Sequence, residues 1–252
     1  MERSEFQKLL NIMKDVPYLI KFQGETVHAN SLLNKGEIYM QSAQYYKELE
    51  MQTGIRGQGD IHENELFGFI SVGMEFPIYC MYAVYGNQIQ NNTIVINRKI
   101  IDDFCQDGGY ITICKTFDEV ARNHTVIAVA HRLKFNQFCT SDDWSAGLVQ
   151  YERKTVSKDI QLLNGKNTAH FFKREDLSYQ QEFRIRINEP AERIELSEEK
   201  SIIVKYNGEK HYRDHKYKPR TEIIHDISAF SIQYATKDLD FDGCKYLLRY
   251  EF

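Results

Sequence analysis

The sequence predicts an α+β fold, with a strand-rich mixed or antiparallel sheet and short helices. The 252 residues include 16 Tyr and 15 Phe, and this aromatic share favours strands and semi-polar pockets over an all-helical bundle. Short apolar segments are separated along the chain by turns that contain glycine, asparagine or proline. No low-complexity linker, charge block or repeat divides them, so we expect a single domain over residues 1–252.

The composition excludes several classes of protein. A net charge of -4 gives no global basic field for nucleic acid, although it leaves room for a local basic groove. The five Cys are an odd number, are widely spaced and include no Cys-x-x-Cys, which argues against a disulfide framework and a zinc site. The N-terminus lacks the pattern of a signal peptide, and no apolar run approaches the roughly 20 residues that cross a bilayer. We therefore expect a cytoplasmic protein without a membrane partner.

The first half of the chain predicts short helices that alternate with strands. Apolar residues at helical spacing before Pro17 predict an N-terminal helix over residues 3–15. Gly36 closes a predicted helical turn, as glycine often does at a helix C-terminus. The expected strands are 18–22, 37–42, 76–84, 110–114 and 126–130, and the expected helical segments are 29–36, 43–50, 98–107 and 117–122.

The second half predicts mainly strands. The expected strands are 147–151, 179–187, 202–206, 223–232 and 246–252. A turn at Asn207 and Gly208 suggests a hairpin. Residues 211–220 are cationic and aromatic, which suits contact with phosphate or nucleic acid and also suits an exposed hairpin loop. We expect the strand region 191–252 to pack on the same core as the rest.

Residues 179–187 have a sharp period-two pattern. On a strand, Gln180, Glu182, Arg184 and Arg186 would lie on one face, and mostly apolar residues on the other. Such a polar row is either a solvated sheet face, where Glu182 pairs with its neighbours, or the floor of a site.

Residues 53–63 form the most loop-like segment, with three glycines in six positions. They lack the lysine and hydroxyl of a phosphate-binding loop and do not fit G-x-G-x-x-G. Asp60 and Glu63 flank His62, which makes a metal site conceivable. Asp60 as a helix N-cap, with Glu63 completing a capping box, is an equally good interpretation.

The triplet Gln180-Gln181-Glu182 resembles the glutamine-x-glutamate element of ADP-ribosyltransferases. The resemblance implies NAD as a substrate. It also implies that Glu182 accepts a hydrogen bond from the 2′-hydroxyl of the nicotinamide ribose and stabilises the positive charge that develops as nicotinamide leaves. Gln180 would orient the incoming nucleophile.

The same resemblance implies further residues that bind the dinucleotide. Arg56 or Arg184 would hold the pyrophosphate, and one of Tyr39, Tyr45 and Tyr46 would stack on nicotinamide. The family also has an Arg or His motif on an N-terminal strand, for which His28 and Arg56 are the candidates. Its Ser-Thr-Ser-like segment has only a poor counterpart, at residues 138–141.

A second resemblance, over roughly residues 18–235, is to an uncharacterised bacterial family. The family carries an Asp-x-x-Glu motif and a late Lys…Tyr-x-x-Glu-aromatic-Arg motif, and some members lie beside phage-defence genes. The matching residues here are Asp60, Glu63, Lys173, Tyr179, Glu182 and Arg184. The resemblance implies that the charged residues among them belong to one framework, whether structural or catalytic.

Three hypotheses follow. The first is an ADP-ribosyltransferase-like toxin or phage-defence effector that modifies a protein or nucleic acid and has a possible antitoxin or immunity partner. The second is a non-enzymatic defence or regulatory module that binds a protein or nucleic acid. The third is a metal-dependent nuclease centred on Asp60, Glu63 and Glu182.

Overall fold

The structure is a computed structural model. It describes residues 15–54, 65–66, 70–71, 73–105, 108–115, 144–151, 171–197, 202–206, 209–213, 215–223, 227–228, 231–242 and 245–249. Residues 3–14 of the expected N-terminal helix, the expected helix 117–122 and the expected strand 126–130 lie outside these residues. No helix within the described ranges is long and apolar enough to cross a membrane.

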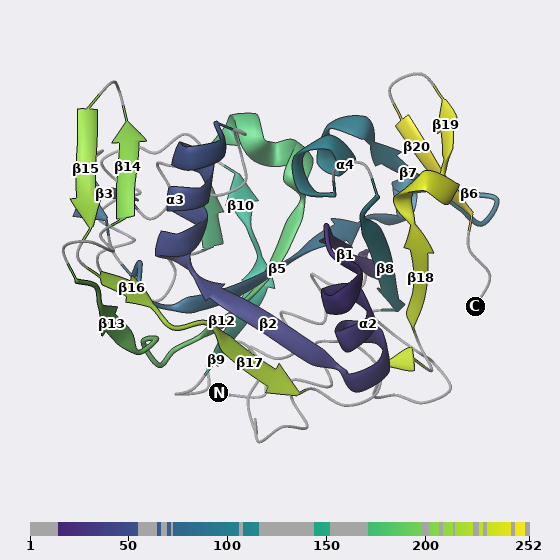
Figure 1. Ribbon diagram of the computed structural model, residues 1–252. Coiled ribbons are helices and arrows are strands. Elements are labelled where there is room, and N and C mark those ends of the chain that lie inside the picture. Colours follow the sequence, from purple (N-terminus) through teal and green to yellow (C-terminus); the bar gives the residue numbers. More distant parts are fainter. Residues whose placement is uncertain are drawn as a thin grey trace, which may run out of the picture.

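An eight-stranded antiparallel sheet organises the fold (Figure 1). The order β17-β2-β5-β1-β8-β18 forms its main path, and β12 and β9 extend from β5. The strands are β1 (Tyr18–Gln23), β2 (Glu37–Ser42), β5 (Pro77–Val84), β8 (Tyr110–Lys115), β9 (Trp144–Leu148), β12 (Glu182–Ile187), β17 (Arg220–Ile223) and β18 (Ser231–Ala235). With a few short helices beside this sheet, the expected strand-rich α+β class is confirmed.

Three α-helices in the described part of the chain accompany the sheet: α2 (Thr26–Lys35), α3 (Ala43–Thr53) and α4 (Arg98–Phe104). Helix α2 connects β1 to β2 and ends at Gly36, whose φ of 64° lies in the left-handed region that glycine adopts at little cost. Helix α3 follows β2 directly, because the Ser42 side chain accepts a hydrogen bond from the backbone N–H of Tyr45. The described residues also form the 3-10 helices η1 (Gly86–Gln88), η3 (Glu175–Gln180) and η6 (Thr236–Asp238).

Short strands form smaller sheets. A four-stranded sheet has the order β19 (Asp240–Asp242), β20 (Lys245–Arg249), β7 (Thr93–Asn97) and β6 (Ile89–Gln90). Four pairs are β3 (Glu65–Leu66) with β4 (Ile70–Ser71), β10 (Gln150–Tyr151) with β11 (Phe172–Lys173), β13 (Arg193–Glu195) with β16 (His215–Tyr217), and β14 (Ile202–Tyr206) with β15 (Glu209–Arg213). The pair β10–β11 is parallel.

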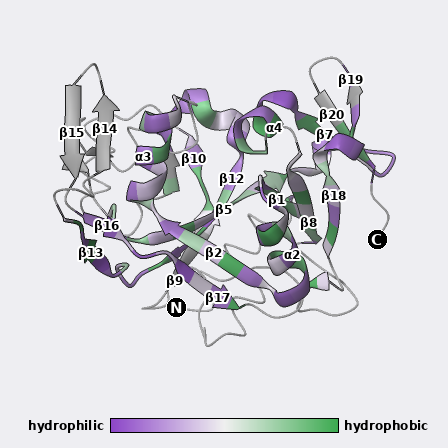
Figure 2. Ribbon diagram, in the orientation of Figure 1, coloured by the Kyte–Doolittle hydropathy of each residue, from purple (hydrophilic) through white to green (hydrophobic). Residues whose placement is uncertain are grey.

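Strand alternation separates two hydrophobic clusters. On β1, Leu19 belongs to one cluster and Ile20 to the other, as expected for neighbouring residues that point to opposite faces. Figure 2 shows hydrophobic and hydrophilic residues side by side on α2, β2 and β8. Both faces of the central sheet are therefore covered.

Two predictions in the second half were wrong. Residues 211–220 are not one exposed loop, because most of them belong to β15, β16 and the start of β17. The expected strand 223–232 is also not continuous: β17 ends at Ile223 and β18 begins at Ser231. By contrast, β14 and β15 pair on either side of residues 207–208, where the sequence predicted a hairpin.

Strand β5 is the branch point that creates the site. Tyr82 pairs with Glu182 of β12 and also with Ile20 of β1, so β12 and β1 lie on opposite edges of β5. Ile78 likewise pairs with β12 and with β2. Strands β1 and β2 therefore share one edge of β5 but diverge, and residues 79–81 have no strand partner on that edge among the described residues.

Candidate functional site

The charged residues of β12 lie on a buried face of the sheet. Strand β12 alternates as predicted: Phe183 and Ile185 belong to a hydrophobic cluster, and Glu182, Arg184 and Arg186 point to the other side. All six residues of the strand are buried. The interpretation of this row as a solvated sheet face is therefore wrong.

The strand is shorter than predicted. Residues 175–180 form η3, and Gln181 follows with a φ of 42°, in the left-handed region. A non-glycine residue held there costs on the order of 1–3 kcal/mol. Gln180 and Glu182 are thus not consecutive same-face residues of one strand. Instead, the turn at Gln181 brings Gln180 from a helix end to the side of Glu182.

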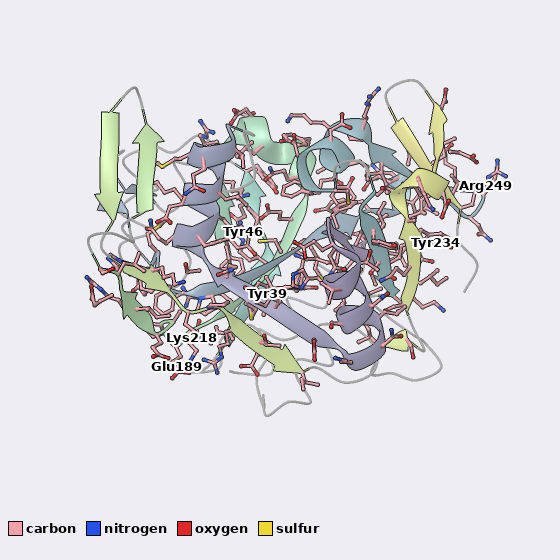
Figure 3. All side chains as sticks on the ribbon, viewed as in Figure 1. Tyr39, Tyr46, Glu189, Lys218, Tyr234 and Arg249 are labelled. Atoms are coloured by element: carbon pink, nitrogen blue, oxygen red, sulfur yellow. The ribbon has the colours of Figure 1, made fainter. Side chains whose placement is uncertain are left out.

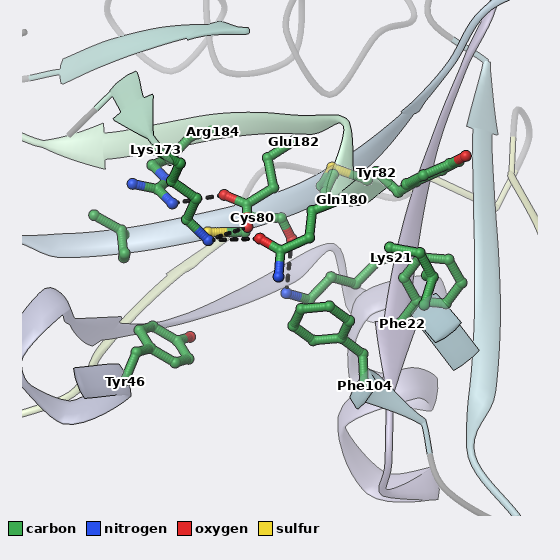
Figure 4. A pocket seen from close by; sticks show the side chains of 13 residues that line it. Lys21, Phe22, Tyr46, Cys80, Tyr82, Phe104, Lys173, Gln180, Glu182 and Arg184 are labelled. Carbon is green, nitrogen blue, oxygen red and sulfur yellow. Dashed lines mark hydrogen bonds and ion pairs between the residues drawn. The ribbon is translucent and has the colours of Figure 1, made fainter. Parts of the chain in front are cut away.

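Lys173 joins these two side chains (Figure 4). Its Nζ donates to Gln180 Oε1 at 2.8 Å and to Glu182 Oε1 at 2.7 Å. The other carboxylate oxygen of Glu182, Oε2, accepts from Arg184 Nη2 at 2.6 Å. The side chains of Lys173 and Arg184 are only 2% and 1% exposed. Three residues that the bacterial-family resemblance placed in one framework therefore form one buried ion-pair cluster.

The cluster keeps Glu182 ionised. Burial alone raises the pKa of Glu182, but the ammonium of Lys173 and the guanidinium of Arg184 outweigh that effect and lower the pKa to about 2. The carboxylate is thus a fixed negative charge at neutral pH.

Backbone contacts fix the orientation of Glu182. The pairing of β10 with β11 sets Tyr151 beside Lys173, and the Tyr151 hydroxyl accepts a hydrogen bond from the Glu182 backbone N–H at 2.8 Å. The Glu182 carbonyl accepts from the N–H of Val149 at 2.8 Å. The segment before the site is held as well, because the N–H of Ala83 donates to the Gln181 carbonyl at 2.7 Å.

A second network holds η3 against α4. The Tyr179 hydroxyl donates to Asp103 Oδ2 at 2.6 Å, and Lys99 Nζ donates to the same oxygen at 2.8 Å. Lys99 also lies over the Tyr179 ring, 4.5 Å from its centroid. Because Tyr179 directly precedes Gln180, this network positions Gln180 relative to α4.

The cluster lines one wall of a cavity of about 80 Å³. In Figure 4, Tyr46 stands on one side of the cavity and Phe104 on the other, with Lys173, Gln180 and Glu182 above them. Further lining residues are Lys21, Phe22, Ile78, Cys80, Met81, Tyr82, Ile100 and Arg184.

A larger groove of about 520 Å³ adjoins this cavity. It lies where β1 and β2 diverge and is bounded by α2 and α3. Tyr39, Tyr45 and Tyr46 all line it, and Tyr39 stacks on His28 with ring centroids 5.3 Å apart. Figure 3 shows Tyr39 on β2 and Tyr46 on α3 near the middle of the molecule. Lys21 and Tyr46 line both spaces, so the groove and the cavity meet at these two side chains.

Lys21 is the residue that the sequence analysis missed. Its Nζ donates to the Cys80 carbonyl at 2.9 Å, in the gap that β1 and β2 leave on the edge of β5. A lysine within the apolar segment 18–22 was the available signal. Of the expected candidates for a cation on an N-terminal strand, His28 lies on α2 and Arg56 lies outside the described residues.

The structure thus brings together seven of the ten residues expected at the site. Glu182, Gln180, Arg184, Lys173 and Tyr46 line the cavity, and Tyr39 and Tyr45 line the adjoining groove. Arg56, Asp60 and Glu63 lie outside the described part of the chain, as do residues 138–141. Within the described part, no three His, Cys, Asp or Glu residues are grouped as a metal would require.

No protein-family model, curated protein or solved structure matches the chain.

Proposed function

We propose that this protein is an ADP-ribosyltransferase that transfers ADP-ribose from NAD to a macromolecule, with Glu182 as its essential carboxylate. One observation carries the proposal. The side chains of Gln180 and Glu182 both accept hydrogen bonds from Lys173 at the wall of a cavity. A tyrosine-lined groove adjoins that cavity.

The spaces suit a dinucleotide in size and character. The groove of about 520 Å³ falls within the roughly 300–1,000 Å³ that is usual for small-molecule sites. Its tyrosine rings provide faces on which nicotinamide or adenine can stack. Lys21, on the first strand, supplies a hydrogen-bond donor where the groove meets the cavity.

The state of Glu182 suits the chemistry. The bond between C1′ of the ribose and the nicotinamide nitrogen breaks, and positive charge develops on the ribose. A carboxylate that is ionised and held in place before the reaction stabilises that charge without reorganising. Lys173 and Arg184 hold Glu182 in this way, so in this proposal Arg184 orients the carboxylate instead of binding the pyrophosphate.

The biological role is a separate part of the proposal. The resemblance of Lys173, Glu182 and Arg184 to the bacterial family supports a toxin or phage-defence effector. Its target is a protein or a nucleic acid, and an antitoxin or immunity partner would mask the groove.

Labelled NAD tests the proposal. The protein is incubated with NAD that carries the label on the adenylate phosphate, together with bacterial protein, RNA and DNA fractions. We expect label in one macromolecular fraction, and protease or nuclease digestion then identifies its class. Glu182→Gln should abolish the label, and Glu222→Gln, which changes a partly exposed carboxylate on β17, should not. A folded protein that transfers no label and releases no nicotinamide would overturn the proposal.

One observation favours a binding module as the second candidate. Val27, Tyr39 and Tyr45 line the groove and are 61%, 38% and 42% exposed, and clustered exposed apolar side chains often mark interaction sites. If the groove serves only to bind a partner, Tyr39→Ser should abolish a growth phenotype that Glu182→Gln leaves intact. The transferase proposal requires both substitutions to reduce it.

A further inference from the structure

Lys21 and Lys173 line the same cavity, but only Lys173 forms an ion pair with a described residue. Lys173 donates to the carboxylate of Glu182 at 2.7 Å. The only hydrogen-bond acceptor of Lys21 among the described residues is the neutral carbonyl of Cys80, at 2.9 Å. The Lys21 ammonium lies 4.2 Å from the centroid of the Tyr79 ring and makes no ion pair with any described residue.

This difference decides which lysine can release its proton. An amine donates a hydrogen bond to a carbonyl whether it is protonated or neutral, so Lys21 keeps its contact with Cys80 after losing a proton. Lys173 would lose its charge attraction to Glu182. Burial lowers the pKa of Lys21 below its ordinary value.

The ionisable groups that face Lys21 act in the other direction. These are Cys80 on β5, Glu182 on β12 and Cys105 at the end of α4, and the effect of each on the pKa of Lys21 is smaller than that of burial. Burial also raises the pKa of both thiols, so at neutral pH only Glu182 carries a negative charge that favours the protonated amine. Tyr79 contributes its ring face. Burial is thus the largest effect on the pKa of Lys21, and the net result is a lowered pKa.

Lys21 is also accessible to a small molecule. It lines both the groove and the cavity of about 80 Å³. One water molecule needs about 10–15 Å³ of cavity volume. A cavity of about 80 Å³ therefore has room for a small organic molecule. Phe22, Ile100 and Phe104 contribute apolar walls to the cavity.

We propose that Lys21 is a nucleophilic amine that forms an imine with a small aldehyde or ketone in this cavity. The neutral amine attacks the carbonyl carbon, a C=N bond forms, and the carbonyl oxygen leaves as water. The two protons of the Lys21 amine are transferred to the carbonyl oxygen and leave with it in the water molecule. Desolvated lysines in apolar pockets are suited to this chemistry. The activity goes beyond ADP-ribosyl transfer, which requires no covalent bond to Lys21.

Reductive trapping tests this proposal. The folded protein is incubated near pH 7 with propanal or benzaldehyde and with cyanoborohydride, which reduces an imine to a stable secondary amine. Trypsin does not cleave at the modified lysine, so labelling of Lys21 produces an uncleaved 15–35 peptide. The exposed Lys237 serves as the internal reference for ordinary surface amines.

We expect Lys21 to be labelled several times faster than Lys237 in the folded protein, and the preference to vanish in urea. Lys21→Arg should remove the 15–35 product, and Lys35→Arg, at an exposed position, should not. Equal labelling of Lys21 and Lys237, no labelling of Lys21, or a preference that persists in urea would each overturn the proposal.

Discussion

The two faces of β12 are equally buried but are stabilised in different ways. Phe183, Ile185 and Ile187 contact one hydrophobic cluster and have exposed fractions of 0–1%. Glu182, Arg184 and Arg186 have exposed fractions of 0–6% on the opposite face. The same strand therefore buries three apolar and three ionisable side chains.

The apolar face of β12 contributes to stability, whereas its charged face is better explained by function. Burying the apolar face stabilises the fold directly, by about 1.5–3 kcal/mol for each large side chain. Burying the charged face costs desolvation energy that ion pairs at best offset, and apolar residues of similar size often serve stability as well or better. The charged face is therefore better explained by a function than by stability, because two of its side chains, Glu182 and Arg184, line the adjoining cavity.

Breaking the charged cluster should have the largest effect. Arg184→Met leaves Glu182 with Lys173 alone and removes one member of a buried set, so we expect a loss of about 3–5 kcal/mol in the free energy of unfolding, measured in urea. Arg220→Met breaks ion pairs at a residue whose side chain is 36% exposed and should cost at most about 1 kcal/mol.

A triple variant distinguishes the cost of an unbalanced buried charge from a requirement for the whole cluster in folding. Lys173→Met, Glu182→Leu and Arg184→Met together remove every charge of the cluster, so the free energy of unfolding should return toward that of the wild type while activity is lost. If the triple variant is as unstable as Arg184→Met, the charged face is needed for folding itself.

Acid should weaken the charged face and leave the apolar face unchanged. Burial raises the pKa of Glu182, but Lys173 and Arg184 lower it more, from 4.5 to about 2. Protons therefore bind Glu182 more tightly in the unfolded chain, and its contribution to stability is complete above about pH 4.5 and lost as the pH falls to about 2. The difference in unfolding free energy between the wild type and Glu182→Gln should shrink across this window. A constant difference would contradict the ion-pair account.

A methyl deletion probes the apolar face. Ile185→Val removes one buried methylene, so we expect a loss of about 0.5–1.5 kcal/mol in unfolding free energy and unchanged activity. Loss of activity at full stability would show that the two faces are not independent.

A change in stability as small as that of Ile185→Val should come from the network that positions Gln180. Tyr179→Phe removes the hydrogen bond to Asp103 but leaves Lys99 paired with it, which should cost about 0.5–1.5 kcal/mol. Activity should fall more than stability does, because Gln180 loses its tie to α4. A proportionate change in both would indicate a purely structural role for Tyr179.

Local patterns predicted much of the fold. The alternation of β12, the strand β2 and the C-terminal glycine of α2 all follow from side-chain period or glycine chemistry, and the structure confirms them. The error at residues 179–181 has a physical cause. Their alternation continues that of the strand, and only the left-handed Gln181 reveals that a 3-10 helix precedes it.

The site was less predictable than the strands. The sequence pattern placed Glu182 and Arg184 on one face, and resemblance alone added Lys173. The role of Lys21 depends on the divergence of β1 and β2 along β5, a long-range pairing that residues 18–22 do not encode locally. Tyr151 is likewise brought to Glu182 by the β10–β11 pairing.

Release of nicotinamide from NAD distinguishes a catalytic role of the charged face of β12 from a purely structural one. Wild-type protein, Glu182→Gln and the matched Glu222→Gln are compared at a temperature at which circular dichroism shows each to be folded. We expect release by the wild type and by Glu222→Gln, and a rate that is lower by about 10²-fold or more in Glu182→Gln. A folded wild type that releases no nicotinamide, or a Glu182→Gln variant as active as Glu222→Gln, would contradict it.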